Sequence, residues 1–474
     1  MFGPRKTWPL ICLLLLTQPL QGCNILPPSP QDAALSATLL LRPRLSKDAQ
    51  IFLPGSPGYV NATQRWSTLF SPSLSLIVAP RTEHDIQSTI QYAHAHAHAL
   101  PFLALGGRHG VAQALNNARH AVGIWTRGMR TITIHEEQGT ATVEPGVQAG
   151  ELTSTLHARG KAAASTACDC VGLLGALLGG GHGFLQGRYG LALDNLVSAR
   201  LVTADGRRVV TASRTQNADL FWALRGAGHN FGVVALVEYR VFDRRPDTDE
   251  WAYEEYVFSR DRLERRRPGV DAEHPVLPFW VIWQGPRVPS QYTDPLRALG
   301  PLSTKRGVVD ITQLNGVAGA NLSSPFCDYG AEVLMSPTSL RKWNVTALRW
   351  AFEVFAALPP WLHRSAALLE GHATQAVQAV PEADTAYPDR LNNLLVSPVM
   401  IADRDADEEY ADRFREALLE GSGDDKLYAY VNYASGDEGL EAIYGYDKWR
   451  LEKLRQLKQI WDPEGRMDFY NPIS

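Results

Sequence analysis

The residues best suited to chemistry in this sequence are glycines, which gather in four groups beside segments predicted to be strands. Glycine adopts positive φ without strain and lets a ligand approach the backbone closely. Successive backbone N–H groups in such loops can cradle a pyrophosphate. Because the pattern recurs beside several strands, it predicts a nucleotide-binding site and not merely a set of turns. The groups are Gly106 and Gly107; Gly172 and Gly175; Gly179, Gly180, Gly181 and Gly183; and Gly226, Gly228 and Gly232.

Other common active-site patterns are missing or incomplete. No G-x-G-x-x-G follows the first predicted strand, and Gly160-Lys161 is followed by Ala162, so neither the usual dinucleotide motif nor a P-loop is found. Gly421-Ser422-Gly423 lacks the residues that frame a hydrolase nucleophile. His94 and His98 are spaced like a metal pair, but no third ligand follows at a suitable spacing. A solvated helix face explains them better, and no metal site is predicted.

Short apolar strands and helices must position the glycine groups. Thr82 is a predicted helix cap, and Glu83 and Asp85 form the acidic first turn of a helix that reaches about Ala99. Residues 24–65 are proline-rich, and we expect them to be irregular. The order of elements predicts an α+β protein of two lobes. The other predicted strands are 76–80, 101–105, 131–134, 140–143, 196–204, 233–239 and 308–314, and the other predicted helices are 149–159 and 446–460.

Composition bounds the class of protein. With 474 residues, 45% of them hydrophobic, the chain is long enough for two or three domains, or for one large domain with an insertion. The formal net charge of −4 gives no support to a nucleic-acid surface, which would need a basic excess. Ordinary apolar content and the lack of a dominant low-complexity block exclude a disordered or fibrous chain.

The first residues predict where the protein is targeted in the cell. Arg5 and Lys6 precede seven apolar residues, Leu10 to Leu16, and this pattern is typical of a secretory signal peptide over residues 1–22. Seven residues cannot cross a bilayer core, which takes about 20, so we expect no membrane span. Leu20 to Cys23 also resembles a bacterial lipoprotein cleavage site. Sequons at Asn61, Asn321 and Asn344 mildly favour secretion and predict glycosylation there.

The cysteines leave their pairing open. Cys12 would leave with the signal peptide, so Cys23, Cys168, Cys170 and Cys327 remain. An oxidising compartment allows two disulfides in any of three connectivities, and the sequence does not choose between them. Cys168-Asp169-Cys170 is too tight for the usual zinc spacing.

Several motifs, taken in their order and spacing, resemble one known family. They are Leu105-Gly-Gly-Arg-His-Gly110, Val143-Glu-Pro-Gly146, Cys168-Asp-Cys-Val-Gly172, Leu178-Gly-Gly-Gly-His-Gly183, Gly187-Arg-Tyr-Gly-Leu-Ala-Leu-Asp194, Asp219-Leu-Phe-Trp-Ala-Leu-Arg-Gly-Ala-Gly228, Tyr430-Val-Asn-Tyr433, Trp461-Asp-Pro463 and Phe469-Tyr-Asn-Pro-Ile473. Together they resemble the FAD-linked oxidases of the vanillyl-alcohol-oxidase type, in the berberine-bridge-enzyme-like group and its fungal form.

The resemblance implies a two-lobed PCMH-type FAD-binding fold, named after p-cresol methylhydroxylase. After a 23–65 extension, residues 66–244 would form the FAD-binding domain, and 421–474 would return to it. Residues 245–420 would form a substrate domain, an antiparallel sheet capped by helices.

The same resemblance implies FAD as a covalently bound cofactor. His109 lies where the family attaches a histidine to the flavin 8α-methyl group, and a neutral imidazole is a competent nucleophile near pH 7. Cys168 corresponds to the cysteine that many members add to flavin C6, and its pKa should be lowered for that attack; the alternative is a structural thiol or a disulfide with Cys23 or Cys327. Arg108 replaces the family's usual glycine. Arg108 and the following residues are also expected to contact the cofactor: Gly106, Gly107, Gly110, Val171, Gly172, Gly175, Gly179, Gly180, Gly181, Gly183, Gly232, Val233 and Asn471.

Catalytic residues are implied in the same way. Tyr433 and Tyr430 match the family's aromatic motif at the flavin face, although they could instead be core aromatics. A tyrosine base needs a pKa well below about 10. Val171 resembles an oxygen gate, which implies O2 as the acceptor and hydrogen peroxide as a product. His182 could reach the flavin or simply fill a turn.

The predicted function is therefore that of an FAD-dependent oxidoreductase acting on a small organic substrate. Two substrate classes compete: a fungal secondary metabolite tailored by oxidation or oxidative cyclisation, and a carbohydrate oxidised at its anomeric carbon. A flavin-free secreted binding protein is disfavoured by His109, Cys168 and the glycine loops. A carbohydrate would need an open aromatic groove, for which the candidates are Trp280, Trp283, Trp343, Trp350 and Trp361.

Overall fold

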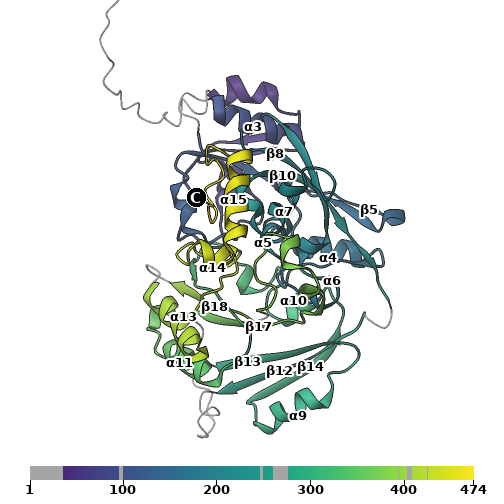
Figure 1. Ribbon diagram of the computed structural model, residues 1–474, viewed down its shortest axis with the longest axis vertical. Coiled ribbons are helices and arrows are strands. Elements are labelled where there is room, and N and C mark those ends of the chain that lie inside the picture. The colour runs from purple at the N-terminus through teal and green to yellow at the C-terminus, as the bar shows by residue number, and fades with distance from the viewer. Residues whose placement is uncertain are drawn as a thin grey trace, which may run out of the picture.

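The computed structural model describes residues 36–95, 100–245, 249–259, 276–392, 394–402, 408–423 and 425–473. The predicted signal peptide, Cys12, Cys23, His96 and His98 lie outside these residues. The described chain forms two lobes (Figure 1), and the C-terminal helix α15 (Lys448–Trp461) runs along the lobe formed by the N-terminal half. Among the described residues, no helix is both long and apolar enough to cross a membrane.

The first lobe contains two main sheets. In the four-stranded sheet, β2, β4 and β3 are parallel neighbours, and the edge strand β1 is antiparallel to β2. The five-stranded sheet is antiparallel throughout. In spatial order, the first sheet is β1 (Gln50–Phe52), β2 (Leu74–Ala79), β4 (Ala121–Trp125) and β3 (Phe102–Leu105), and the second is β5 (Ile132–His135), β6 (Thr140–Val143), β10 (Gly232–Arg240), β8 (Leu196–Thr203) and β9 (Val209–Ser213).

Helix α3 (Glu83–Ala95) joins the two sheets through a shared core. Its buried Ile86 and Ile90 are spaced i, i+4 and so lie on one face. They pack in one cluster with Val78 of β2 and Val202 of β8. The helix begins where Asp85 accepts hydrogen bonds from the backbone N–H groups of residues 81 and 82, at 2.9 Å each.

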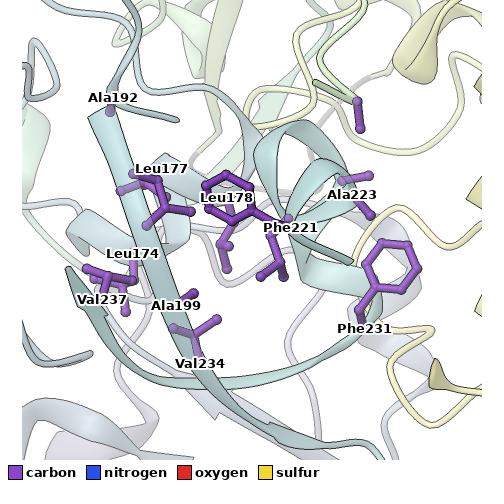
Figure 2. Packing of buried hydrophobic residues seen from close by; sticks show 14 of the residues in the cluster. Leu174, Leu177, Leu178, Ala192, Ala199, Phe221, Ala223, Phe231, Val234 and Val237 are labelled. Atoms are coloured by element: carbon purple, nitrogen blue, oxygen red, sulfur yellow. The ribbon is translucent and has the colours of Figure 1, made fainter. Parts of the chain in front are cut away.

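The largest core lies on the five-stranded sheet beneath several helices. Leu174 and Leu177 of α5 (Leu173–Gly179) and Phe221 of α7 (Ala218–Ala227) pack near Val234 and Val237 of β10 (Figure 2). Each fully buried side chain of this kind contributes about 1.5–3 kcal/mol of hydrophobic stabilisation. The C-terminal segment joins this cluster through Leu451, Leu454 and Leu457 of α15.

The second lobe is built from two antiparallel sheets. In one, β12 (Trp251–Ser259) lies between β13 (Val276–Gln284) and β14 (Ser303–Val309). In the other, β18 (Leu394–Ala402) pairs with β15 (Glu332–Met335), β16 (Thr338–Leu340) and β17 (Ala366–Gly371). Helices α11 (Val345–Ala356) and α13 (Glu408–Ser422) pack on this second sheet through one hydrophobic cluster.

The remaining elements are short. They are α2 (Pro57–Thr63), α4 (Ala149–His157), β7 (Lys161–Ala162), α6 (Gln186–Tyr189), β11 (Phe242–Asp243), α9 (Ser290–Ala298), α10 (Leu314–Val317), α12 (Gln375–Gln378) and α14 (Leu440–Tyr444).

The expected α+β class with two lobes is confirmed, but two local predictions need correction. Residues 24–65 are not irregular throughout, because β1 and α2 lie within them, and β1 adds an antiparallel edge strand to the four-stranded sheet. The strand predicted at 308–314 is instead β14 at Ser303–Val309, whose exposed polar first half hid it, and Leu314 begins α10. The helix predicted to reach about Ala99 is found as α3 up to Ala95, and its predicted last residues lie outside the described part of the chain.

Candidate active site

A large cavity lies between the two lobes and has a volume of about 2110 Å³. Ligand pockets usually measure about 300–1,000 Å³, so this one has room for a large cofactor and a substrate together. Its wall comes from the loop after β3, from the loop before α5 and the start of β10, and across from them from β13, β17 and α11. The predicted site residues on this wall are Gly106, Gly107, Arg108, His109, Gly110, Cys168, Val171, Gly172, Gly175, Gly232, Val233, Tyr430 and Tyr433.

Two glycines bring the loops of His109 and Cys168 together. A Cβ added at Gly107 would lie 2.1 Å from the backbone nitrogen of Gly172, and one added at Gly172 would lie 2.5 Å from that of Gly107. The two backbones can approach so closely only because neither residue has a side chain. The Tyr329 hydroxyl donates to the Gly107 carbonyl at 3.0 Å and holds this contact from the second lobe.

A matched pair of substitutions separates packing from ligand contact. Gly172→Ala should lower the melting temperature strongly, because its methyl group meets backbone atoms that cannot move aside. Gly175→Ala should leave stability equal or slightly higher, since a Cβ there meets no protein atom within 4 Å and alanine favours the helix. Because Gly175 lines the cavity, a loss of cofactor at unchanged melting temperature would place the cofactor against it. Unchanged stability in Gly172→Ala would contradict the contact described.

His109 sits in an aromatic cage. Its ring stacks on Trp66 at a centroid distance of 5.4 Å and meets the edge of Tyr329 at 5.7 Å. Its buried Nε2 has no hydrogen-bond partner among the described residues. Burial, together with the charges of Arg108 and Arg65, lowers the pKa of His109 to about 3. The imidazole is therefore neutral near pH 7 and has a nitrogen lone pair available.

Arg108 performs the backbone role of the glycine that it replaces. Its φ is 60°, in the left-handed region, so the loop keeps the turn that glycine would allow. Its guanidinium lies 4.9 Å from the Tyr329 ring centroid and hydrogen-bonds the Asn61 carbonyl. Arg65 donates to the Gly110 carbonyl at 2.6 Å from the other side. Two guanidinium groups thus hold the ends of the His109 loop.

The structure selects one cysteine pairing. Cys170 and Cys327 form a disulfide across 157 residues, and Cys168 is a free thiol whose Sγ lies 3.4 Å from that of Cys170. The disulfide ties the Cys168 loop to the segment that carries Phe326 and Tyr329, two rings of the cage around His109 and Trp66. It therefore braces both candidate attachment loops.

The expectation of a lowered pKa for Cys168 is wrong. Burial is the main cause that raises its pKa to about 11, and the charges of Asp169 and Glu370 add to it, against hydrogen bonds from the backbone of Cys170 and Val171. The loop places the buried thiol near the carboxylates of Asp169 and Glu370, whereas a thiolate is stabilised by neighbouring cations.

The two predicted tyrosines have different surroundings. The Tyr430 oxygen accepts hydrogen bonds from the Gly181 N–H at 2.8 Å and from Asn432 at 2.7 Å, whereas the Tyr433 hydroxyl donates to Glu370 Oε2 at 2.9 Å. Burial raises the pKa of both, and the charge of Glu370 raises that of Tyr433 further. The lowered pKa required of a lone tyrosine base is therefore not found.

Glu370 is the functional candidate that the sequence analysis missed. Burial alone would raise its pKa, but the neighbouring His372 and Tyr433 side chains outweigh burial and lower it. Glu370 and His372 follow Leu368 at intervals of two along β17 and its extension, so the three share one face, and all line the cavity. A lone carboxylate in an apolar strand is the signal that could have revealed it.

Five predicted cofactor contacts do not lie on the cavity wall. A Cβ at Gly179, Gly180, Gly181 or Gly183 would strike protein atoms at 2.0–2.7 Å, which belong in turn to Asn432, Tyr430, Ala192 and Ser165, so close internal packing requires a glycine at each position. Asn471 is 2% exposed and joins the C-terminal tail to the Val431 carbonyl by a 3.0 Å hydrogen bond.

The structure also shows the positions of the predicted groove tryptophans, of His94 and of the sequon asparagines. Trp280, Trp283 and Trp343 line the cavity, whereas Trp350 and Trp361 lie on the surface away from it. The His94 ring hydrogen-bonds the Ala204 carbonyl at 3.0 Å. Of the sequon asparagines, Asn61 is exposed, whereas Asn321 and Asn344 are half-buried and Asn344 caps α11.

Comparison with known proteins defines the class. A family model described as an FAD-binding domain matches residues 74–212. The FAD-linked oxidoreductase chyH of Penicillium rubens is 33% identical over 471 residues, covering 92% of this chain and 93% of the relative. The FAD-linked oxidoreductase anuG of Penicillium roqueforti is 34% identical over 470 residues, covering 91% of each.

Solved structures agree on the fold. The carbohydrate oxidase of Microdochium nivale superposes with a TM-score of 0.74 at 22% identity, covering 92% of this chain and 99% of that one. Glucooligosaccharide oxidase of Acremonium strictum, described with a 6-S-cysteinyl, 8α-N1-histidyl FAD, gives 0.74 at 21% identity, covering 91% and 97%. The fold is thus the two-lobed PCMH-type fold that was expected.

The chain belongs to the FAD-linked oxidoreductases, and it shares its fold with a solved berberine-bridge-enzyme-like protein. It is an enzyme, and FAD is its cofactor. The residues present fit that cofactor, because an unpartnered buried imidazole nitrogen and a free thiol both line a cavity of sufficient size.

Proposed function

We propose that this chain is an oxidase that dehydrogenates a largely apolar small molecule, with FAD attached to His109 and Cys168 and with O2 as electron acceptor. The observation that carries the proposal is the Tyr433–Glu370 hydrogen bond of 2.9 Å, set in the same cavity as His109 and Cys168. FAD, when bound, supplies the acceptor for the hydride that leaves the substrate carbon.

The protein must accept the proton that leaves the substrate together with the hydride. Tyr433 cannot act as a preformed phenolate, because its pKa is raised. Glu370, whose pKa is lowered, is charged at neutral pH and already accepts the Tyr433 proton in a hydrogen bond. The pair can therefore act as one base: the tyrosine oxygen takes the substrate proton while its own proton passes to Glu370.

The two covalent bonds should differ in their pH dependence. His109, with a pKa of about 3, is neutral from pH 5 to 8, so its bond to FAD should form at one rate across this range. Cys168, with a pKa of about 11, should react faster by about tenfold per pH unit, because only its thiolate attacks.

Mass spectrometry can follow both bonds. Apoprotein from riboflavin-starved cells is mixed with FAD under air at pH 6–9, quenched in acid, and mapped by peptide. A Cys168 bond that forms equally fast at pH 6 and pH 9 would show that the thiolate is already present and would contradict the raised pKa.

The wall of the second lobe favours an apolar substrate. Phe279, Trp280 and Ile282 of β13 face the cavity together with Leu348 and Phe352 of α11. Such a wall suits a secondary metabolite of aromatic or lipophilic character better than a sugar, which needs many polar partners. Trp280, Trp283 and Trp343 keep a carbohydrate, oxidised at its anomeric carbon, as the second candidate.

Secretion and oxygen use complete the proposal. The Cys170–Cys327 disulfide is typical of an oxidising compartment and supports secretion with removal of residues 1–22, and Asn61 is exposed enough to carry a glycan. Val171 lies on the cavity wall, as the proposed oxygen gate requires.

A peroxide screen tests the function. Purified enzyme in air is offered aryl and alkyl alcohols, N-alkylated aromatic amines and oligosaccharides, with peroxide read by a peroxidase-coupled dye. We expect peroxide with an apolar alcohol or amine. Best turnover with an oligosaccharide would favour the second candidate, and anaerobic flavin bleaching without peroxide in air would remove O2 from the proposal.

A further inference from the structure

The carboxylate of Glu370 has a second neighbour besides Tyr433. His372 Nε2 lies 3.6 Å from Glu370 Oε1, on the opposite carboxylate oxygen from the one that accepts the Tyr433 hydrogen bond. That nitrogen is buried and has no hydrogen-bond partner among the described residues. His372 also lines the cavity. Tyr433, Glu370 and His372 therefore form a short row of proton-exchanging groups.

A second imidazole nearby already has a hydrogen-bond partner at each ring nitrogen. His182 lies 6.5 Å from His372 between ring centroids, but its Nε2 contacts the Tyr387 hydroxyl at 2.9 Å and its Nδ1 contacts Gln186 at 3.0 Å. Burial and the neighbouring His372 lower the pKa of His182 to about 3. Of the two rings, only His372 has an unpartnered nitrogen beside the carboxylate.

We propose that His372 is the proton acceptor beyond Glu370, so that the substrate proton leaves through Tyr433, Glu370 and His372 in turn. This inference rests on the proposed Tyr433–Glu370 base. The substrate O–H or N–H bond breaks and its proton joins the Tyr433 oxygen, while the Tyr433 proton moves to Glu370 and then to His372 Nε2. The electron pair of the adjacent C–H bond leaves as hydride, so the substrate is oxidised and FAD is reduced.

The low proton affinity of Glu370 explains why a further proton acceptor beyond it is useful. A carboxylate whose pKa is lowered holds a proton poorly, whereas an imidazole takes up and releases protons between about pH 5 and 8. Moving the proton onward resets Glu370 for the next turnover. The titratable groups that face this row are His182 in the turn before α6, Cys168 in the loop before α5, and Tyr430 beside Tyr433.

The test is anaerobic stopped-flow reduction of the holoenzyme by the substrate that reduces it fastest in the screen. We expect His372→Ala to slow flavin reduction about tenfold to a hundredfold, with the substrate Kd unchanged. Added imidazole should restore much of the rate, increasingly as the imidazole itself loses its proton.

Three controls keep the outcomes distinct. His372→Gln must retain the melting temperature and bound FAD, and it should be slow without responding to imidazole. His363→Ala removes another histidine of the same cavity and should keep the wild-type rate. Glu370→Gln tests the base itself: if it reduces at the wild-type rate, the proposed base fails.

The outcome for His372 is separate from that control. If Glu370→Gln is slow while His372→Ala reduces at the wild-type rate, only the role of His372 is overturned. A slow His372→Ala that imidazole does not restore, with a changed substrate Kd, would likewise overturn it and leave the ring a packing role.

Discussion

Glu370→Gln should lower kcat by about 10²–10⁴-fold while leaving the covalent flavin intact, because the amide cannot take the Tyr433 proton. The substitution preserves the shape of the side chain and removes only its charge. In the wild type, the Tyr433 hydroxyl oxygen lies 2.9 Å from Glu370 Oε2. Tyr433→Phe should cause a loss of similar size, and the double variant should be little worse than either, because the two residues act as one base.

The measurement is kcat and KM with the substrate found by the peroxide screen, beside bound FAD per chain. Glu353→Gln, another carboxylate change on the cavity wall, is the matched control and should keep kcat within about twofold. Additive losses in the double variant, or an active Glu370→Gln, would show that the two groups do not form a single base.

Removing the disulfide is the second change with a large expected effect. The double variant Cys170→Ser/Cys327→Ser should lose about 2–4 kcal/mol of stability, because the bridge closes a loop across 157 residues. It should also lose covalent flavin, since the bridge holds the Cys168 loop against the segment that cages His109. Both cysteines are replaced together so that neither is left to pair with Cys168.

Thermal melting and intact mass measure these two effects. Cys168→Ser is the control: it keeps the disulfide and should melt within a few degrees of the wild type, with only its own bond to FAD lost. A double variant with wild-type melting temperature and full covalent flavin would show that the bridge supports neither the fold nor the attachment loops.

The sequence supports local predictions better than long-range ones. The glycines, strands and helices of the first lobe were predicted closely because each signal lies within a few residues; β6 and β10 are examples. β1 was missed because three residues give no pattern. The close packing at Gly179, Gly180, Gly181 and Gly183 was not predicted, because sequence cannot distinguish a glycine that faces a ligand from one that faces packed protein.

The site depends on contacts between distant segments, which no local pattern encodes. Tyr433 meets Glu370 from 63 residues away, and Cys170 finds Cys327 from 157 residues away. The pKa of Cys168 was predicted in the wrong direction for the same reason: it is raised mainly by burial in the folded chain, and also by the charge of Glu370 from β17 of the other lobe. Only the tertiary arrangement places those charges.

Acid precipitation of the purified protein tests the central claim most directly. Wild-type protein, His109→Ala, Cys168→Ala and the double variant are denatured, pelleted and examined for yellow colour and for the mass of FAD on the chain. We expect colour in the wild-type pellet, colour retained by each single variant, and colour released only by the double variant. Colour that leaves the wild-type pellet for the supernatant would contradict the covalent roles of both His109 and Cys168.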